Sequence, residues 1–63
     1  MSVKRRDIIR HLKQYGFFKL REGGNHTIFV NKHGRRVPVG RHNTFTRIEA
    51  NIMCMEAGIP AIF

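Results

Sequence analysis

The sequence predicts an α+β fold in which two helices cover one face of a three-stranded antiparallel sheet. Three observations predict it: an apolar stripe with helical spacing near the start, three short apolar segments separated by turns that contain glycine, and a second helical segment introduced by a capping box. Packing both helices on one face of the sheet buries every apolar stripe at once. We therefore expect residues 1–63 to form a single domain.

The first helix is expected over residues 3–15, with Ser2 as its N-cap. Its apolar residues recur at the spacing of one helix face, and Gly16 follows where a glycine commonly ends a helix. The stripe consists of Ile8, Ile9, Leu12 and Tyr15.

The three strands are expected to form a meander with short connections. They span residues 17–22, 25–31 and 35–39, and the turns fall at Gly23-Gly24 and at Lys32-His33-Gly34. Pro38 has no backbone N–H to donate, so the third strand is expected at an edge of the sheet. In the second strand both faces carry apolar groups, and the sequence leaves open whether His26 or its neighbour Thr27 faces solvent.

Residues 41–45 are expected to be irregular, and the second helix is expected to begin at Thr46, which forms a capping box with Glu49. Gly58, followed by Pro60, is expected to end this helix. Its inner stripe is predicted to be Ile48, Ile52 and Met55.

The opposite side of the second helix is also apolar, and the tail that follows it carries no charge. A helix in a two-layer domain needs one apolar face, so we predict that the surplus face and the tail form a contact patch for a protein partner or for a second copy of the chain. A tail that merely covers the core is the alternative. The predicted patch consists of Met53, Cys54, Ile62 and Phe63.

The charge of the chain indicates the class of its ligand. Twelve Lys and Arg residues against four Asp and Glu residues give a formal net charge of +8. Such an excess favours a polyanion such as nucleic acid, although it can also serve solubility alone. Arg6, Arg10 and Lys13 follow one another along the face opposite Leu12, and we predict that they track RNA phosphates, with a merely solvated face as the alternative.

Several other classes of function are disfavoured. The longest apolar run is far too short to span a bilayer, and the single Cys54 cannot form an internal disulfide, so we expect a cytoplasmic protein without membrane contact. The four carboxylates are scattered and no two histidines are spaced as metal ligands on a helix, so we expect neither a metal nor another cofactor. Cys54 lies within a helix and is better explained as a packed side chain than as a nucleophile.

Metal-independent cleavage of RNA suits the residues that remain. RNA supplies its own nucleophile, the 2′-hydroxyl, so the protein needs a group that exchanges a proton near neutral pH and cations that stabilise the phosphorane. Histidine fits the first role and arginine the second. His11 and His33 are expected at the surface without a special task, and His42 is a weaker candidate than His26.

The residues around His26 resemble those of the HicA toxins, also called YcfA-like proteins. The stretch 23–29, Gly-Gly-Asn-His-Thr-Ile-Phe, matches the glycine, x, histidine, x, x, aromatic core of that family. Nearly the whole chain takes part, because further resemblance lies in segments 4–9, 31–39, 41–42 and 55–59.

This resemblance implies a metal-independent mRNA interferase, an endoribonuclease toxin, with a fold like that of a double-stranded-RNA-binding domain. The family's essential histidine lies on the second strand and corresponds to His26. Members of the family are held inactive by a HicB antitoxin, which is the partner we expect. Besides the basic residues of the first helix, the expected RNA contacts are Gly24, Arg35, Arg36, Arg41 and His42.

The chain departs from the family pattern in one region. Gly40 stands where many members have proline, and the Pro-Gly that usually precedes the last helix is missing. These departures leave the geometry of residues 40–45 and the role of His42 open. Two alternatives to an active toxin are a non-catalytic RNA-binding module and an inactivated homologue that acts only through its antitoxin.

Overall fold

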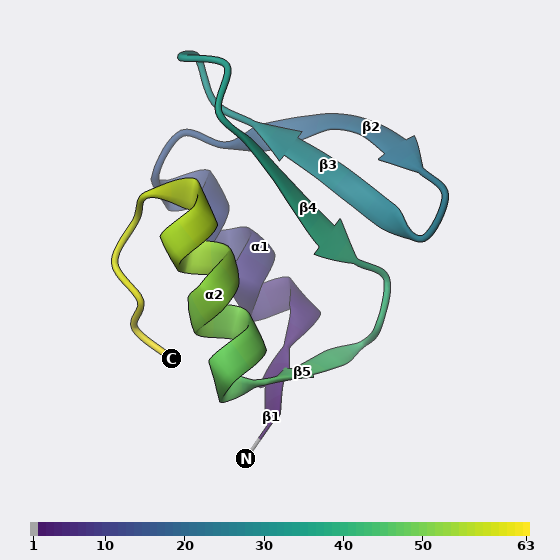
Figure 1. Cartoon of the computed structure of the whole chain (residues 1–63), viewed down its shortest axis with the longest axis vertical. Coiled ribbons are helices and arrows are strands. Elements are labelled where there is room, and N and C mark those ends of the chain that lie inside the picture. Colours follow the sequence, from purple (N-terminus) through teal and green to yellow (C-terminus); the bar gives the residue numbers. More distant parts are fainter. Residues whose placement is uncertain (1) are drawn as a thin grey trace.

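The computed structural model describes residues 2–63, which form two helices, a three-stranded antiparallel sheet and a smaller two-stranded sheet. In Figure 1 both helices lie below the three-stranded sheet, with α2 in front of α1 and the two-stranded sheet at the opposite end of the molecule. The predicted α+β class, with two helices and three antiparallel strands, is confirmed. The elements are β1 (Ser2–Lys4), α1 (Arg5–Gln14), β2 (Phe18–Gly23), β3 (His26–Val30), β4 (Arg36–Gly40), β5 (Thr44–Thr46) and α2 (Arg47–Ala57).

The start of the chain is a strand rather than the first turn of a helix. β1 pairs antiparallel with β5, and Ser2 lies opposite Thr46 instead of capping α1, so the prediction that Ser2 is the N-cap is wrong. Lys4 takes the N-cap position without a side-chain hydrogen bond. The physical reason is a long-range contact: Val3 is buried opposite Phe45, and the strand pairing satisfies the backbone that a helix would otherwise have used.

The apolar stripe of α1 is largely as expected. Ile8 and Leu12 are almost completely buried in the core, whereas Tyr15, at the C-cap position, is half exposed. Gly16 has a φ of 86°, the left-handed conformation that commonly ends a helix and that favours glycine.

The three-stranded sheet has the order β2-β3-β4, so β4 is an edge strand, as Pro38 predicts. Thr27 lies opposite Val39 and Phe29 lies opposite Val37, and all four side chains are buried. Because side chains alternate along a strand, His26 lies on the outward face, which answers the question that the sequence left open.

The second helix begins as predicted. The Thr46 backbone N–H donates to Glu49 Oε1 at 2.8 Å, and the Glu49 N–H donates to Thr46 Oγ1 at 3.1 Å, which completes the capping box. Gly58, with a φ of 71°, ends the helix.

The prediction for the buried face of α2 is wrong. Ile48, Ile52 and Met55 are 73%, 49% and 68% exposed, and the buried face consists of Ala50, Met53, Cys54 and Ala57. Both faces are apolar, so periodicity alone did not distinguish them. The two alanines allow the helix to pack closely, because a small side chain lets the backbone approach its neighbours. Met53 and Cys54 therefore belong to the interior and cannot form the predicted surface patch.

The tail after α2 folds back along the helices. The Phe63 N–H donates to Asn51 Oδ1 at 2.9 Å, and Phe63 packs half-buried against the core, whereas Ile62 is 64% exposed. The ring of His11 is buried and hydrogen-bonded to the Pro60 carbonyl at 2.7 Å, so the expectation of a surface His11 is also wrong. For Phe63 the core-covering alternative is correct. No helix within residues 2–63 is long and apolar enough to cross a bilayer.

Candidate active site

His26 and His42 line one hollow, with a volume of about 540 Å³, where the end of β4 meets α2. We call it the histidine hollow. His26 enters it from the first position of β3, and His42 enters it from the chain between β4 and β5. His11 is the one histidine within residues 2–63 whose ring makes a hydrogen bond, and the ring of His42 packs edge-on against Phe45, with 6.1 Å between the ring centroids. The remaining lining residues are Asn25, Pro38, Gly40, Phe45, Glu49, Ile52, Met53 and Glu56.

Two glycines flank His26 across the sheet. Gly23 of β2 and Gly40 of β4 are its register partners, so neither neighbouring strand places a side chain beside the imidazole. A Cβ at Gly40 would stand 3.3 Å from the Phe45 ring and 3.7 Å from the ring of His42. Glycine at position 40 therefore allows the chain of residues 41–45 to fold close to the strand end.

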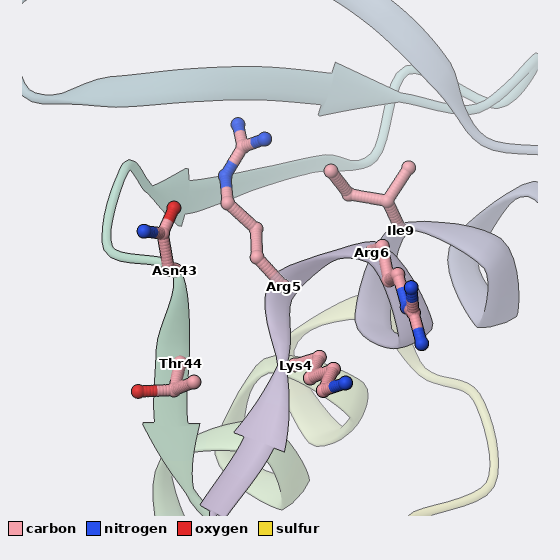
Figure 2. A pocket seen from close by; sticks show the side chains of 6 residues that line it. All are labelled: Lys4, Arg5, Arg6, Ile9, Asn43 and Thr44. Carbon is pink, nitrogen blue, oxygen red and sulfur yellow. The ribbon is translucent and has the colours of Figure 1, made fainter.

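A hydrogen-bonded network holds the strand end that carries His26. The Arg5 Nε donates to the Gly40 carbonyl at 2.9 Å, and its Nη2 donates to Thr27 Oγ1 at 2.7 Å. The Thr27 hydroxyl donates in turn to Glu22 Oε1 at 2.5 Å, which also accepts from Arg41 Nη2 at 3.2 Å. Figure 2 shows the Arg5 side chain extended toward the sheet. Arg5 thus links the start of α1 to both strands that meet at His26.

The network fixes the charge of Glu22. The hydroxyl of Thr27 is the largest cause that lowers the pKa of this carboxyl; desolvation opposes it, and the cations Arg41, Lys19 and Arg5 each lower the pKa by a smaller amount. The pKa of Glu49 is lowered as well, first by the backbone N–H and hydroxyl of Thr46. Both carboxylates are anionic at neutral pH and are engaged in structural contacts. Glu49 is therefore unsuited to accept a proton near neutral pH.

This network was not predictable from the sequence. Arg5 and Glu22 belong to no functional motif, and Thr27 occupies a position of the glycine–histidine motif at which any residue is allowed. One feature does point to such a network: Thr27 shares the core face of its strand with Phe29, and a buried hydroxyl requires hydrogen-bond partners.

The basic residues of α1 line a groove on another part of the surface. Its first part, a hollow of about 490 Å³ that we call the basic hollow, is shown in Figure 2. The groove continues along the helix past Arg6, Arg10 and Lys13, which therefore share one surface as the sequence predicts. Asp7 Oδ1 lies 3.8 Å from Arg6 Nε and from Arg10 Nη1, and exposed ion pairs at that distance reduce the positive charge of the groove only slightly. The basic hollow is lined by Lys4, Arg5, Arg6, Ile9, Asn43 and Thr44.

The other predicted RNA contacts are dispersed. Gly24 lies in the β2–β3 turn with a φ of 53°, and Arg41 is bound to Glu22. Arg35 donates from Nε to the Glu56 carbonyl at 2.7 Å and thereby stabilises the end of α2. Arg36 starts β4, roughly 13 Å along the strand from Gly40. Of the predicted RNA contacts, His42 is the one that lines the histidine hollow together with His26.

Cys54 is a packed core residue. Its side chain is buried in α2, and burial raises the pKa of its thiol, which keeps the thiol protonated. Within residues 2–63, no group of three or more His, Cys, Asp or Glu side chains converges in a way that could hold a metal ion.

Fold and site together define a small, strongly basic α+β protein that presents a histidine on the outward face of its central strand. The family model described as "HicA toxin of bacterial toxin-antitoxin" matches residues 5–59, which include α1, the whole three-stranded sheet and α2. The chain belongs to the HicA toxin family, and the resemblance noted in the sequence is confirmed. It is therefore a toxin with an antitoxin as its partner. No curated protein matches the chain.

Proposed function

We propose that this toxin is an endoribonuclease that cleaves mRNA without a metal ion and uses His26 as its catalytic residue. The observation that carries the proposal is the cross-strand row Gly23, His26 and Gly40. It presents an exposed imidazole on the central strand of the sheet, with no side chain on either side and a second imidazole, His42, in the same hollow.

The chemistry follows from RNA itself. The 2′-hydroxyl attacks the adjacent phosphate, its proton passes to a base, and the 5′-oxygen leaves with a proton from an acid, so that a 2′,3′-cyclic phosphate and a 5′-hydroxyl result. We assign the first proton transfer to His26 and the second to His42, because both residues line the same hollow. The net charge of +8 favours the additional negative charge of the phosphorane, and Arg41, which precedes His42 in the chain and bonds Glu22, is the nearest arginine in sequence.

RNA reaches the hollow through electrostatic attraction. The groove along α1 supplies Arg6, Arg10 and Lys13 as phosphate contacts, and Gly24, Arg35 and Arg36 contribute at the margins of the sheet. These contacts are independent of base identity, because they involve the phosphate backbone.

The partner is a HicB-like antitoxin. Met53 and Cys54 are buried and therefore do not mediate self-association. The apolar residues that α2 does expose are Ile48, Ile52 and Met55, and Ile52 also lines the histidine hollow. A protein that covers this stripe therefore also covers part of the candidate site.

Incubation of the purified toxin with a defined mRNA in EDTA tests the activity. We expect cleavage that persists in the chelator, and we expect no cleavage at a bond whose 2′-hydroxyl is replaced by hydrogen, because the nucleophile is then missing. Cleavage of the 2′-deoxy bond at an unchanged rate, or a strict requirement for magnesium, would contradict the mechanism. A wild-type protein that binds RNA but leaves it intact would be a binding module or an inactivated homologue.

A further inference from the structure

The basic hollow of Figure 2 is built from two segments that are distant in sequence. Lys4, Arg6 and Ile9 come from the start of the chain, and Asn43 and Thr44 come from the entry to β5. The Arg5 N–H donates to the Asn43 carbonyl at 2.9 Å, and Lys4 pairs with Thr44 in the two-stranded sheet. Backbone hydrogen bonds therefore fix the two walls relative to each other before any ligand binds.

The walls combine three kinds of contact. Lys4 and Arg6 offer exposed cations, Ile9 offers a half-buried apolar side, and Asn43 and Thr44 offer an amide and a hydroxyl. Among the hydrogen bonds of residues 2–63, the Asn43 contact is made by its backbone carbonyl, so its side-chain amide stays available with two donors and one acceptor. A nucleotide needs this combination: cations for phosphate, an apolar surface for the face of the base, and paired donor and acceptor groups for its edge.

The basic hollow adjoins the candidate active site. His42 lines the histidine hollow and Asn43, the next residue, lines the basic hollow, so two consecutive residues connect the two hollows. In the arrangement that this adjacency favours, one RNA strand spans both hollows, with a phosphate beside His26 and the neighbouring nucleotide beside Asn43. Beyond that nucleotide, the groove with Arg10 and Lys13 continues along α1.

We propose that the basic hollow is a nucleotide subsite for single-stranded RNA, in which Asn43 binds the edge of one base next to the cleaved bond. Ile9 contacts the face of that base, and Lys4 and Arg6 bind the flanking phosphates. The base must be unpaired, because Asn43 uses the edge that a duplex would occupy. The position of the cleaved bond rests on the proposed function, whereas the binding of a base by Asn43 does not.

Binding measurements in a His26→Ala background test the subsite without cleavage. The probes are fluorescein-labelled oligoribonucleotides of each single base, measured by fluorescence anisotropy. We expect the parent to prefer one base by about tenfold, toward the lower end of what a bidentate amide–base contact contributes, and Asn43→Ala to remove this preference. Arg6→Ala should weaken binding of all four probes alike and reduce the salt slope of log K by about 0.7, the value for one phosphate contact on a single strand.

Gln14→Ala is the matched control, because Gln14 carries an amide in the groove but lies outside the basic hollow. It should leave the base preference unchanged. Asn43→Asp, which keeps the shape of the side chain and loses the two donors, provides a second variant and should alter the preference. Thermal unfolding of each variant shows whether the fold is intact.

The outcomes separate this proposal from the proposed function. An unchanged base preference in both Asn43 variants overturns the subsite and leaves cleavage by His26 untouched. Tighter binding of duplex RNA than of single strands, or of an acidic peptide than of RNA, also overturns it. A base preference that depends on Asn43, in a wild-type protein that cleaves no RNA, supports the subsite and refutes the proposed function.

Discussion

Replacement of Thr27 by valine tests the network that holds the strand end of His26. The substitution keeps the shape of a side chain that is only 1% exposed and removes the hydroxyl that accepts from Arg5 and donates to Glu22. Hydrogen bonds to charged groups contribute about 1.5–3 kcal/mol each, but the exposed end of the network can turn to water. We therefore expect a loss of about 2 kcal/mol in the free energy of unfolding, or roughly 8 to 16 °C in Tm for a domain of this size.

Thermal and urea unfolding followed by circular dichroism measure this loss. Thr44→Val is the matched control: its side chain is exposed on the short strand β5, so its Tm should change by a few degrees at most. Cleavage of RNA by Thr27→Val should fall as well, because Arg5 then holds β4 through Gly40 but no longer holds β3. A Thr27→Val protein that is as stable as wild type would refute the role assigned to the network.

The same variant has a defined pH signature. The folded-state pKa of Glu22 lies below its ordinary value of 4.5, with the Thr27 hydroxyl as the largest cause. A lowered carboxyl pKa stabilises the fold above the ordinary value, and this stabilisation is lost as the pH falls through the folded-state pKa. The difference in the free energy of unfolding between wild type and Thr27→Val should therefore be largest above pH 4.5 and should decrease as the pH falls below that value. The pKa of Glu49 is also lowered, but its Thr46 contacts are present in both proteins and cancel in this comparison.

Three further predictions concern packing, capping and charge. Gly40→Ala should lower the free energy of unfolding by about 1–3 kcal/mol in urea, because the alanine Cβ would lie 3.3 Å from the buried ring of Phe45. Unchanged stability would contradict this and show that the ring can move aside without cost. Thr46→Ala should cost about 1 kcal/mol through loss of the capping box, measured in the same way, and a neutral effect would contradict that contribution. Replacement of Arg6, Arg10 and Lys13 by alanine should reduce the salt slope of RNA binding by about 2, whereas an unchanged slope would mark α1 as a merely solvated face.

Local signals predicted the elements of the fold that depend on nearby residues. The Thr46–Glu49 capping box, the glycine after α1 and the edge position of the Pro38 strand each follow from the chemistry of one or two residues, and each is present. The pairing of β1 with β5 depends instead on the contact of Val3 with Phe45, two residues that are far apart in the sequence. No local pattern of three residues indicates such a partner.

The orientation of α2 shows a second limit of periodicity. One face offers Ile48, Ile52 and Met55, and the other offers mostly smaller residues, so a scale of hydrophobicity favours the first. The structure buries the second face, where Ala50 and Ala57 are almost completely inaccessible, so that a larger side chain such as isoleucine would overpack either position. The available space is a property of the assembled fold and is not contained in the sequence of the helix.

The candidate site was predictable in part. His26 was identifiable from the glycine–histidine motif, and the structure adds its outward orientation, its glycine neighbours and the shared hollow with His42. The role of Arg5 was not predictable, because its partners Gly40 and Thr27 lie on different strands. The hydrogen bond from Arg35 to the end of α2 was not predictable either, because its partner, the Glu56 carbonyl, lies 21 residues away in the sequence.

The rate of cleavage of one defined RNA by wild type, His26→Ala and His33→Ala in EDTA tests the central claim most directly. His33 is the matched control, because it is exposed in the turn before β4 and lies outside the histidine hollow. We predict that His26→Ala keeps its fold and its RNA affinity but cleaves roughly 10²–10⁴-fold more slowly, the usual effect of losing a general base, while His33→Ala cleaves at the wild-type rate. Cleavage by a folded His26→Ala at the wild-type rate would contradict the assignment of His26 as the catalytic residue.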